Sequence, residues 1–423
     1  MEGYRPETEL LLQLMRAALC RPDSALDWMD GCSAPALAEQ IEEQSLVTML
    51  YPTIRGQAGG AWEALAARLK PVYDRELHRG LMQEYEIGAL LDDLERDGID
   101  CLPMKGWVMR QYYPDPLMRS MADFDVLLKE MDSQRMQKWM EARGYAPDHI
   151  EQSVHDTYRK PPYMNIELHR RLMEEGRLRR QHTAWRENCL ASLWQPGFRL
   201  EGKAHIYRLS DEDFLVHHLL HFYKHFTESG VGLRPLADLY LFLQKKGQTL
   251  DRAYLEKQLE ALHILAFARR MEQLAQTCLE GQRLDQNARL VVEYLTHTGI
   301  YGDRATMETA RLFQSEGKTI GQSRRNDFFS RCFAPLETMK NTYPRLRRAP
   351  WLLPFYWAVR IGRIVFREPY KLAAARRYQT QSRYDHLQEI YRAAGILGDA
   401  RLRMPKKQKA LRHPSTYSGG SGR

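Results

Sequence analysis

Apolar residues recur at three- and four-residue spacing through residues 1–98, a pattern typical of amphipathic α-helices. The last predicted helix of this stretch ends at Gly98, because glycine readily adopts the backbone conformation that closes a helix. The helical period returns after about residue 175 and continues to roughly residue 300. The chain is therefore predicted to carry helical regions on both sides of a segment with a different pattern.

That segment, residues 99–175, contains short apolar runs of the length expected for strands. Three strands are predicted, in IDCLPMKG (Ile99–Gly106), ADFDVLLK (Ala122–Lys129) and MNIELH (Met164–His169). Helical spacing separates the runs, and one of the intervening helices is expected over Asp132–Arg143. Strands that alternate with helices over some seventy residues predict a compact α/β unit.

The order of these elements predicts an α+β protein, with a small mixed β-sheet core flanked by N- and C-terminal helical regions. At 423 residues the chain is long enough for two or three packed units. We divide it into an N-terminal helical region, an α/β core, a helical domain, a basic aromatic helical segment and a disordered basic tail. Their expected bounds are residues 1–98, 99–175, 176–345, 346–400 and 401–423.

Charge is distributed unevenly along the chain. The net charge is +8, but from Arg345 to Arg423 there are 18 Lys/Arg against 4 Asp/Glu, a balance of +14 that leaves −6 for residues 1–344. The mildly acidic body disfavours a long nucleic-acid track. The basic segment, with the aromatic stretch Trp351–Phe366, favours phosphates, an acidic partner or peripheral contact with an anionic membrane through residues 346–412. The alternative is a helix packed on its own domain, followed by a solvated tail.

Cellular location is predicted from the cysteines and the apolar runs. The six cysteines are scattered singly, without a C-x-x-C pair, which favours reduced thiols over disulfides or a zinc site. The N-terminus is predicted as an amphipathic helix, and no run approaches the roughly 20 apolar residues of a membrane-spanning helix. We therefore expect a cytoplasmic protein.

The residues with the clearest chemical meaning lie in the second predicted strand. Asp123 and Asp125 are two residues apart, so their side chains point to the same side of a strand. Two adjacent carboxylates repel each other unless a cation lies between them, and Mg²⁺ prefers such oxygen ligands together with substrate phosphates. Glu167, in the third predicted strand, is the candidate for a third carboxylate in a site for in-line displacement at phosphorus.

Several motifs together resemble a known family. They are MKG (Met104–Gly106), YPDPLMR (Tyr113–Arg119), DFDVLL (Asp123–Leu128), IELH (Ile166–His169) and, in the helical part, LRPLADLYLFL (Leu233–Leu243). They are similar to motifs of the uncharacterised nucleotidyltransferase family, within the DNA polymerase β superfamily. This resemblance implies a nucleotidyltransferase core and Mg²⁺-dependent transfer of a nucleoside monophosphate from an NTP to an acceptor.

The resemblance also implies roles for individual residues. The catalytic, metal-binding carboxylates would be Asp123, Asp125 and Glu167. The residues that steady the triphosphate would be Lys105, Gly106 and Arg119. Better-studied members of the superfamily have Gly-Ser or Gly-Gly at the phosphate turn, where this chain has Lys-Gly-Trp. The serine contact is therefore absent, and Lys105 is expected to supply a positive charge in its place.

The acceptor stays open at this point. A sugar, antibiotic, lipid precursor, peptide, protein or RNA all fit the implied chemistry, and the acidic body favours a small molecule, peptide or protein over a long nucleic acid. The altered phosphate turn leaves an alternative, in which the chain is a catalytically inactive nucleotide-binding protein or a scaffold that docks on a membrane or a partner.

Other polar side chains lie at helical or strand spacing and need an interpretation. His217, His221 and His225 share one face of a predicted helix, but no carboxylate joins them, so core or substrate-pocket histidines are expected rather than a metal site. His169 shares the strand face of Glu167 and could orient it or contact substrate. In the helical domain, a basic and an acidic residue four positions apart, Arg234 and Asp238, are expected to form an intrahelical ion pair.

Overall fold

The fold was analysed in a computed structural model of the chain. The structure describes residues 5–21, 24–130, 132–151, 155–172, 185, 189–315 and 319–397. The tail predicted over residues 401–423 lies outside the described residues, as does the expected start of the helical domain at residue 176.

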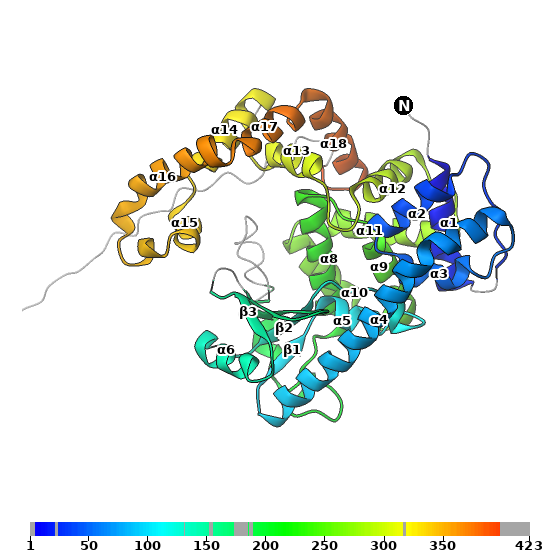
Figure 1. The fold of residues 1–423 in the computed structure, drawn as a ribbon, viewed down its shortest axis with the longest axis horizontal. Coiled ribbons are helices and arrows are strands. Elements are labelled where there is room, and N and C mark those ends of the chain that lie inside the picture. The colour runs from blue at the N-terminus through cyan, green and yellow to red at the C-terminus, as the bar shows by residue number, and fades with distance from the viewer. Residues whose placement is uncertain are drawn as a thin grey trace, which may run out of the picture.

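The N-terminal region consists of four helices, as its apolar spacing predicts. They are α1 (Pro6–Cys20), α2 (Ala34–Glu43), α3 (Val47–Ile54) and the long α4 (Gly60–Arg96). In Figure 1, α1–α3 gather at one end of the molecule, and α4 runs from them to the sheet. The chain leaves α4 through Gly98, whose φ of +69° is a left-handed conformation that glycine adopts without a steric penalty.

A five-stranded mixed sheet follows α4. Its strands are β1 (Cys101–Pro103), β2 (Phe124–Leu128), β3 (Ala146–His149), β4 (His155–Lys160) and β5 (Met164–His169), in the order β1-β2-β5-β4-β3. The central pair, β2 and β5, is parallel, and the other pairs are antiparallel. Because β5 enters between β2 and β4, strands that are distant in sequence become neighbours.

Two of these strands, β3 and β4, were not predicted from the sequence. Every residue of β3 is exposed, and β4 contains a single apolar residue, Tyr158. Neither strand therefore has the apolar alternation on which strand prediction depends. Two short helices complete the core: α5 (Lys105–Arg110) after β1, and α6 (Ser133–Glu141), whose first turn is capped by Asp132 and which lies within the helix expected over Asp132–Arg143.

The sheet lies between two apolar layers. One face, which includes Phe124 and Val126, packs against α6 and the C-terminal half of α4. The opposite face, which includes Leu127, belongs to a larger core shared with the helices that follow the sheet. Asp123, Asp125 and Glu167 alternate with the residues of the first face, so they are directed toward the side on which those helices lie.

The helices that follow the sheet in the described part of the chain are amphipathic. They are α8 (Asp211–Glu228), α9 (Arg234–Lys246), α10 (Arg252–Ala261), α11 (Leu265–Glu280), α12 (Gln286–Thr298) and α13 (Arg304–Gln314). They share one continuous apolar core with α1 and α3. The N-terminal region and the helical part after the sheet are thus packed together around common side chains.

The last helices form an arc that extends away from this body (Figure 1). They are α14 (Ile320–Cys332), α15 (Leu336–Thr342), α16 (Leu353–Gly362), α17 (Pro369–Tyr378) and α18 (Gln381–Ala393). A small separate apolar cluster lies at the far end of the arc. The architecture confirms the α+β prediction, with the mixed sheet between helical regions. In the described part of the chain, no helix is long and apolar enough to span a membrane.

Candidate active site

The three candidate carboxylates come from two adjacent parallel strands. Asp123 directly precedes β2, Asp125 lies within it, and Glu167 lies in β5 as the register partner of Asp125. Paired residues on neighbouring strands point to the same face, and so do residues two apart on one strand. The fold therefore brings together the three acidic side chains that the sequence analysis selected.

Asp125 is the most enclosed of the three and has two partners. One oxygen, Oδ1, lies 2.6 Å from Nζ of Lys105 and 2.8 Å from Nε2 of His169. Burial by itself would raise the pKa of Asp125, but the charge of Lys105 and the hydrogen bond with His169 outweigh it and hold the pKa below its ordinary value. Asp125 is therefore ionised throughout the physiological range.

Asp123 lies in a different electrostatic environment. Burial, followed by repulsion from the neighbouring Asp125 carboxylate, raises the pKa of Asp123 to about 6. The charge of Lys105 counteracts this effect only in part. Two carboxyls two residues apart thus have pKa values shifted in opposite directions, which is common where acidic groups are gathered for function.

Glu167 is bracketed by two histidines. Its Oε2 lies 3.4 Å from Nε2 of His169 and 3.5 Å from Nδ1 of His155. His155 comes from β4 and is the register partner of His169. Potential ligand atoms of Glu167, His155 and His169 lie within 4.8 Å of one another. Within the described part of the chain, these three residues form the one cluster of at least three His, Cys, Asp or Glu side chains that could hold a metal ion.

His155 is the site residue that the sequence analysis did not select. It lies at the start of β4, a strand that the apolar pattern does not reveal, so nothing placed it beside Glu167. The sequence signal that could have identified His155 is its spacing from Thr157, a second polar residue two positions away. Both side chains lie on the face of the sheet to which Glu167 points. His169, by contrast, was expected to share the face of Glu167, and it contacts both Glu167 and Asp125.

Lys105 acts as an internal counterion in this arrangement. It follows β1 and has a φ of +47°, a left-handed conformation that costs a non-glycine residue about 1–2 kcal/mol. Burial alone would lower the pKa of Lys105, but the Asp125 charge outweighs it and raises the pKa, so the side chain remains an ammonium. In the structure, the Lys105 ammonium therefore forms an ion pair with the Asp125 carboxylate, whereas the family resemblance implied a contact with the triphosphate.

Arg119 is also engaged within the protein. Its Nε and Nη2 donate to the two carboxylate oxygens of Asp238 at 2.7 and 2.8 Å, and Tyr113 donates to the same carboxylate at 2.8 Å. These groups are buried at the contact between the core and α9. Such bidentate pairing commits the guanidinium to fixing the core on the helical part, so a phosphate contact by Arg119 has no support from this geometry.

The same contact corrects a second expectation. Asp238 was predicted to pair with Arg234 along one helix, but its carboxylate is held by Arg119 instead. Arg234 donates from Nη1 to the backbone oxygen of Ser120 at 3.0 Å. The prediction was wrong because helical spacing identifies neighbours on one helix but not the charges that tertiary packing brings from another segment.

Gly106 lies against this buried arginine. A Cβ atom at this position would be 2.7 Å from Nη1 of Arg119, a distance that side chains essentially never show. The absence of a side chain at Gly106 is thus explained by packing within the protein. The family resemblance implies that Gly106 also helps to steady the triphosphate, and that role stays a prediction.

Substitution Gly106→Ala separates the two roles. We expect it to lower the free energy of unfolding by about 1–3 kcal/mol, because Asp238 restrains the arginine that would have to move. Urea unfolding would measure the change. Gly88→Ala in α4 is the matched control, since nothing lies within 4 Å of its added Cβ and stability should be unchanged or slightly higher. Unchanged stability of Gly106→Ala would contradict the packing role.

The predicted histidine stripe lies on α8. His217 is buried, and burial, followed by the nearby charge of Lys105, lowers the pKa of His217 to about 3. Burial and the same lysine also lower the pKa of His221, whose Nε2 lies 3.1 Å from Nε2 of His225. The imidazoles of His217 and His221 are therefore neutral, and both lie within electrostatic range of Lys105 on the helical side of the site.

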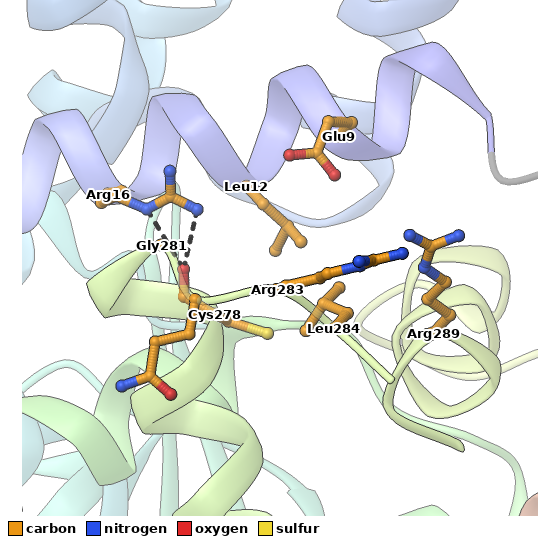
Figure 2. A pocket seen from close by; sticks show the side chains of 9 residues that line it. Glu9, Leu12, Arg16, Cys278, Gly281, Arg283, Leu284 and Arg289 are labelled. Atoms are coloured by element: carbon orange, nitrogen blue, oxygen red, sulfur yellow. Dashed lines mark hydrogen bonds between the residues drawn. The ribbon is translucent and has the colours of Figure 1, made fainter. Parts of the chain in front are cut away.

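A separate cavity of about 370 Å³ lies between α1 and the end of α11 (Figure 2). Arg16 lines it and donates from Nε and Nη2 to the backbone oxygen of Cys278 at 3.3 and 3.2 Å. This contact satisfies a carbonyl at the end of α11, where helices leave carbonyls without helical partners. None of the candidate carboxylates lines this cavity, so we assign Arg16 a structural role.

Comparison with known proteins assigns the chain to a class. The model of the uncharacterised nucleotidyltransferase family matches residues 32–280, which is more than half of the chain. The protein therefore belongs to this nucleotidyltransferase family. The matched region contains the whole sheet and the helices from α2 to α11, whereas α1 precedes it and α12–α18 follow it. No curated protein and no solved structure matches the chain.

Proposed function

We propose that the protein transfers a nucleoside monophosphate from an NTP to an acceptor in a reaction that depends on a divalent metal ion. Family membership supports nucleotidyl transfer. The observation that carries the proposal is the register of β2 and β5, which sets Asp125 beside Glu167 and directs both, with Asp123, to one face of the sheet. We further expect the protein to act in the cytoplasm, on a small-molecule, peptide or protein acceptor.

The residues present fit a divalent cation. Three acidic side chains converge, and a cation is the simplest counterion for Asp123, whose pKa is raised to about 6 by burial and by repulsion from Asp125. Mg²⁺ prefers carboxylates and phosphates, and Asp123, Asp125 and Glu167 would hold it. The imidazoles of His155 and His169 lie close enough to join the ligand set or to fix Glu167 by hydrogen bonds, and they would also suit Mn²⁺.

Each residue of the site has a role in the proposed reaction. A bound divalent cation would neutralise charge on the triphosphate during in-line attack at the α-phosphorus. The acceptor oxygen would form the new bond to that phosphorus as the bond to the leaving pyrophosphate breaks, and Glu167 would either complete the metal site or take the acceptor proton. Lys105 keeps Asp125 ionised, and its ammonium can be released toward a phosphate. Rate acceleration would come mainly from positioning and charge neutralisation.

Metal binding should depend on pH through Asp123. Because metal ligands must be deprotonated and the pKa of Asp123 is raised to about 6, affinity for Mn²⁺ should fall by up to about tenfold per pH unit below pH 6. Electron paramagnetic resonance at pH 5, 6 and 7 would measure free Mn²⁺. Asp123→Asn should bind weakly at every pH and lose this dependence. A wild-type affinity that stays constant over this range would contradict the role of Asp123.

The metal-free protein should show the opposite dependence for stability. The folded state binds the Asp123 proton more tightly than the unfolded chain does, so this group adds stability as the pH falls from about 7 toward 5. The comparison to make is wild type against Asp123→Asn in EDTA by urea unfolding. The difference in unfolding free energy should shrink as the pH falls, because the wild-type carboxyl becomes neutral like the amide.

Calorimetric titration with each of the four NTPs tests the proposal directly. We expect Mg²⁺-dependent binding of at least one NTP by wild type, which EDTA abolishes and the double variant Asp123→Ala/Asp125→Ala lacks. Labelled NTP then defines the reaction: α-label should pass to an acceptor while pyrophosphate is released. A folded wild-type protein that binds no NTP would overturn the enzyme proposal in favour of a scaffold.

A further inference from the structure

The arm, which we define as residues 320–371 and which contains α14, α15 and α16, is rich in exposed apolar side chains. Of the 13 large apolar side chains that are exposed in the described part of the chain, nine lie on the arm: Phe328, Phe329, Phe333, Trp351, Phe355, Val359, Val365, Phe366 and Tyr370. Extended apolar patches on soluble proteins mark surfaces that bind a partner. The family match ends at residue 280, so nothing in it accounts for this surface.

The exposed residues form a stripe along α16 and the turns that adjoin it, which are a 3₁₀ turn over Pro350–Leu352 and a π-helical turn over Arg363–Arg367. Trp351, Phe355, Val359 and Phe366 are separated by four, four and seven positions, the spacing of one helical face. Their exposed fractions are high, at 77% for Trp351, 61% for Phe355 and 84% for Phe366. Surface helices normally carry charged residues on their exposed side, but the exposed side of α16 carries aromatic and aliphatic side chains.

The opposite side of α16 is already occupied by the chain itself. Trp357 donates from Nε1 to the backbone oxygen of Ala334 at 2.9 Å, and Arg360 donates from Nε to the backbone oxygen of Arg331 at 2.6 Å. These contacts fix the rotation of the helix on α14. The apolar stripe therefore faces outward as a consequence of how the helix is anchored, and a small rotation cannot bury it.

Positive charge accompanies the stripe. The arm contains 11 Lys/Arg and 3 Asp/Glu, a balance of +8. Each acidic residue is paired within the arm: Asp327 with Arg331, Glu337 with Lys340, and Glu368 with Arg363 and Lys371. The arginines left exposed near the stripe include Arg345, Arg348 and Arg367. Anionic groups in a partner would thus meet cations on both sides of the apolar residues.

We propose that the arm docks on an anionic membrane surface. Aromatic side chains on one helical face with arginines at its margins form the pattern of a helix that lies in the lipid headgroup region. Val359 and Val365 offer no ring for base stacking, so the stripe fits acyl chains better than a nucleic acid. Since no described helix can span a bilayer, the contact is peripheral. This proposal is independent of nucleotidyl transfer.

Cosedimentation of the full chain with vesicles tests the proposal. Wild type should bind phosphatidylcholine vesicles that contain about 30% phosphatidylserine, bind pure phosphatidylcholine much more weakly, and be released by salt. Trp351→Ser/Phe355→Ser/Phe366→Ser should weaken binding to the anionic vesicles by at least about tenfold. The control is Leu81→Ser/Tyr85→Ser, which removes equally exposed apolar side chains from α4 and should bind like wild type.

Circular dichroism and thermal unfolding will show that both variants are folded, which is expected because every replaced side chain is exposed. Equal binding by wild type and the triple variant, or no preference for anionic vesicles, would overturn the proposal. So would concentration-dependent dimerisation that only the triple variant loses, since a second copy would then cover the stripe. RNA binding without vesicle binding would assign the surface to nucleic acid instead.

Discussion

Replacing Asp125 by asparagine should weaken binding of Mn²⁺ and of Mg²⁺–NTP by roughly 100-fold or more, since even partners of metal ligands change affinity 10- to 100-fold. Asp125 is the carboxylate that the site keeps ionised, through Lys105 at 2.6 Å and His169 at 2.8 Å. The amide has nearly the same shape but carries no charge for a cation. Mn²⁺ titration by electron paramagnetic resonance and NTP calorimetry would measure the loss.

The control for this substitution is Asp148→Asn. Asp148 lies on β3 of the same sheet, and its ion pair with the exposed Arg159 is remote from the candidate carboxylates in the strand order. The Asp148→Asn variant should bind metal and nucleotide like wild type. If Asp125→Asn binds Mg²⁺–NTP as tightly as Asp148→Asn does, the converging carboxylates are not the nucleotide site, although the family assignment would stand.

Replacing Asp238 by asparagine should lower the free energy of unfolding by about 3–5 kcal/mol, the usual effect of leaving one charge of a buried pair without its partner. Arg119, donating through two nitrogens, and Tyr113 both depend on this carboxylate. Because the pair joins the core to α9, the variant should also loosen the contact between them. Urea unfolding would give the change, and hydrogen exchange at the core–α9 contact would show its location.

The pH dependence gives an internal check on this buried pair. Burial raises the pKa of Asp238, but Arg119 outweighs it and holds the pKa below its ordinary value. The stabilisation is therefore present above the unfolded pKa near 4 and is lost as the pH falls further. The difference between wild type and Asp238→Asn should shrink in acid. Asp74→Asn, which breaks the exposed pair with Lys70, should leave stability unchanged, and an equal effect of both substitutions would contradict the buried-pair account.

Much of the fold could be predicted because local rules agree with the tertiary structure there. The strand predicted over Met164–His169 has the bounds of β5, α6 lies within the helix expected over Asp132–Arg143, and the chain leaves α4 at Gly98. In each case the signal is local: apolar alternation, helical spacing or a glycine that closes a helix. Strands β3 and β4 escaped prediction because pairing, of β4 with β5 and of β3 with β4, rather than an apolar pattern of their own, makes them strands.

The site was predictable to a similar extent. Alternation alone places Asp123 and Asp125 on one face, and the strand carrying Glu167 was found from its apolar residues. Some of the side chains that contact these and other buried polar residues could not be predicted from the sequence. His155 reaches Glu167 only through the antiparallel pairing of β4 with β5, and Arg119 reaches Asp238 across 119 positions of sequence.

The sequence by itself thus indicated the class of protein, through the resemblance of its motifs to a known family. It also determined the two types of region and which acidic residues share a strand face, because these depend on residue type and on spacing within one element. Only the tertiary structure decided which charges meet. It placed Lys105 on Asp125, paired Arg119 with Asp238 and turned the aromatic stripe of α16 outward. The physical reason is that side-chain contacts between elements depend on strand order and helix rotation, which no local pattern encodes.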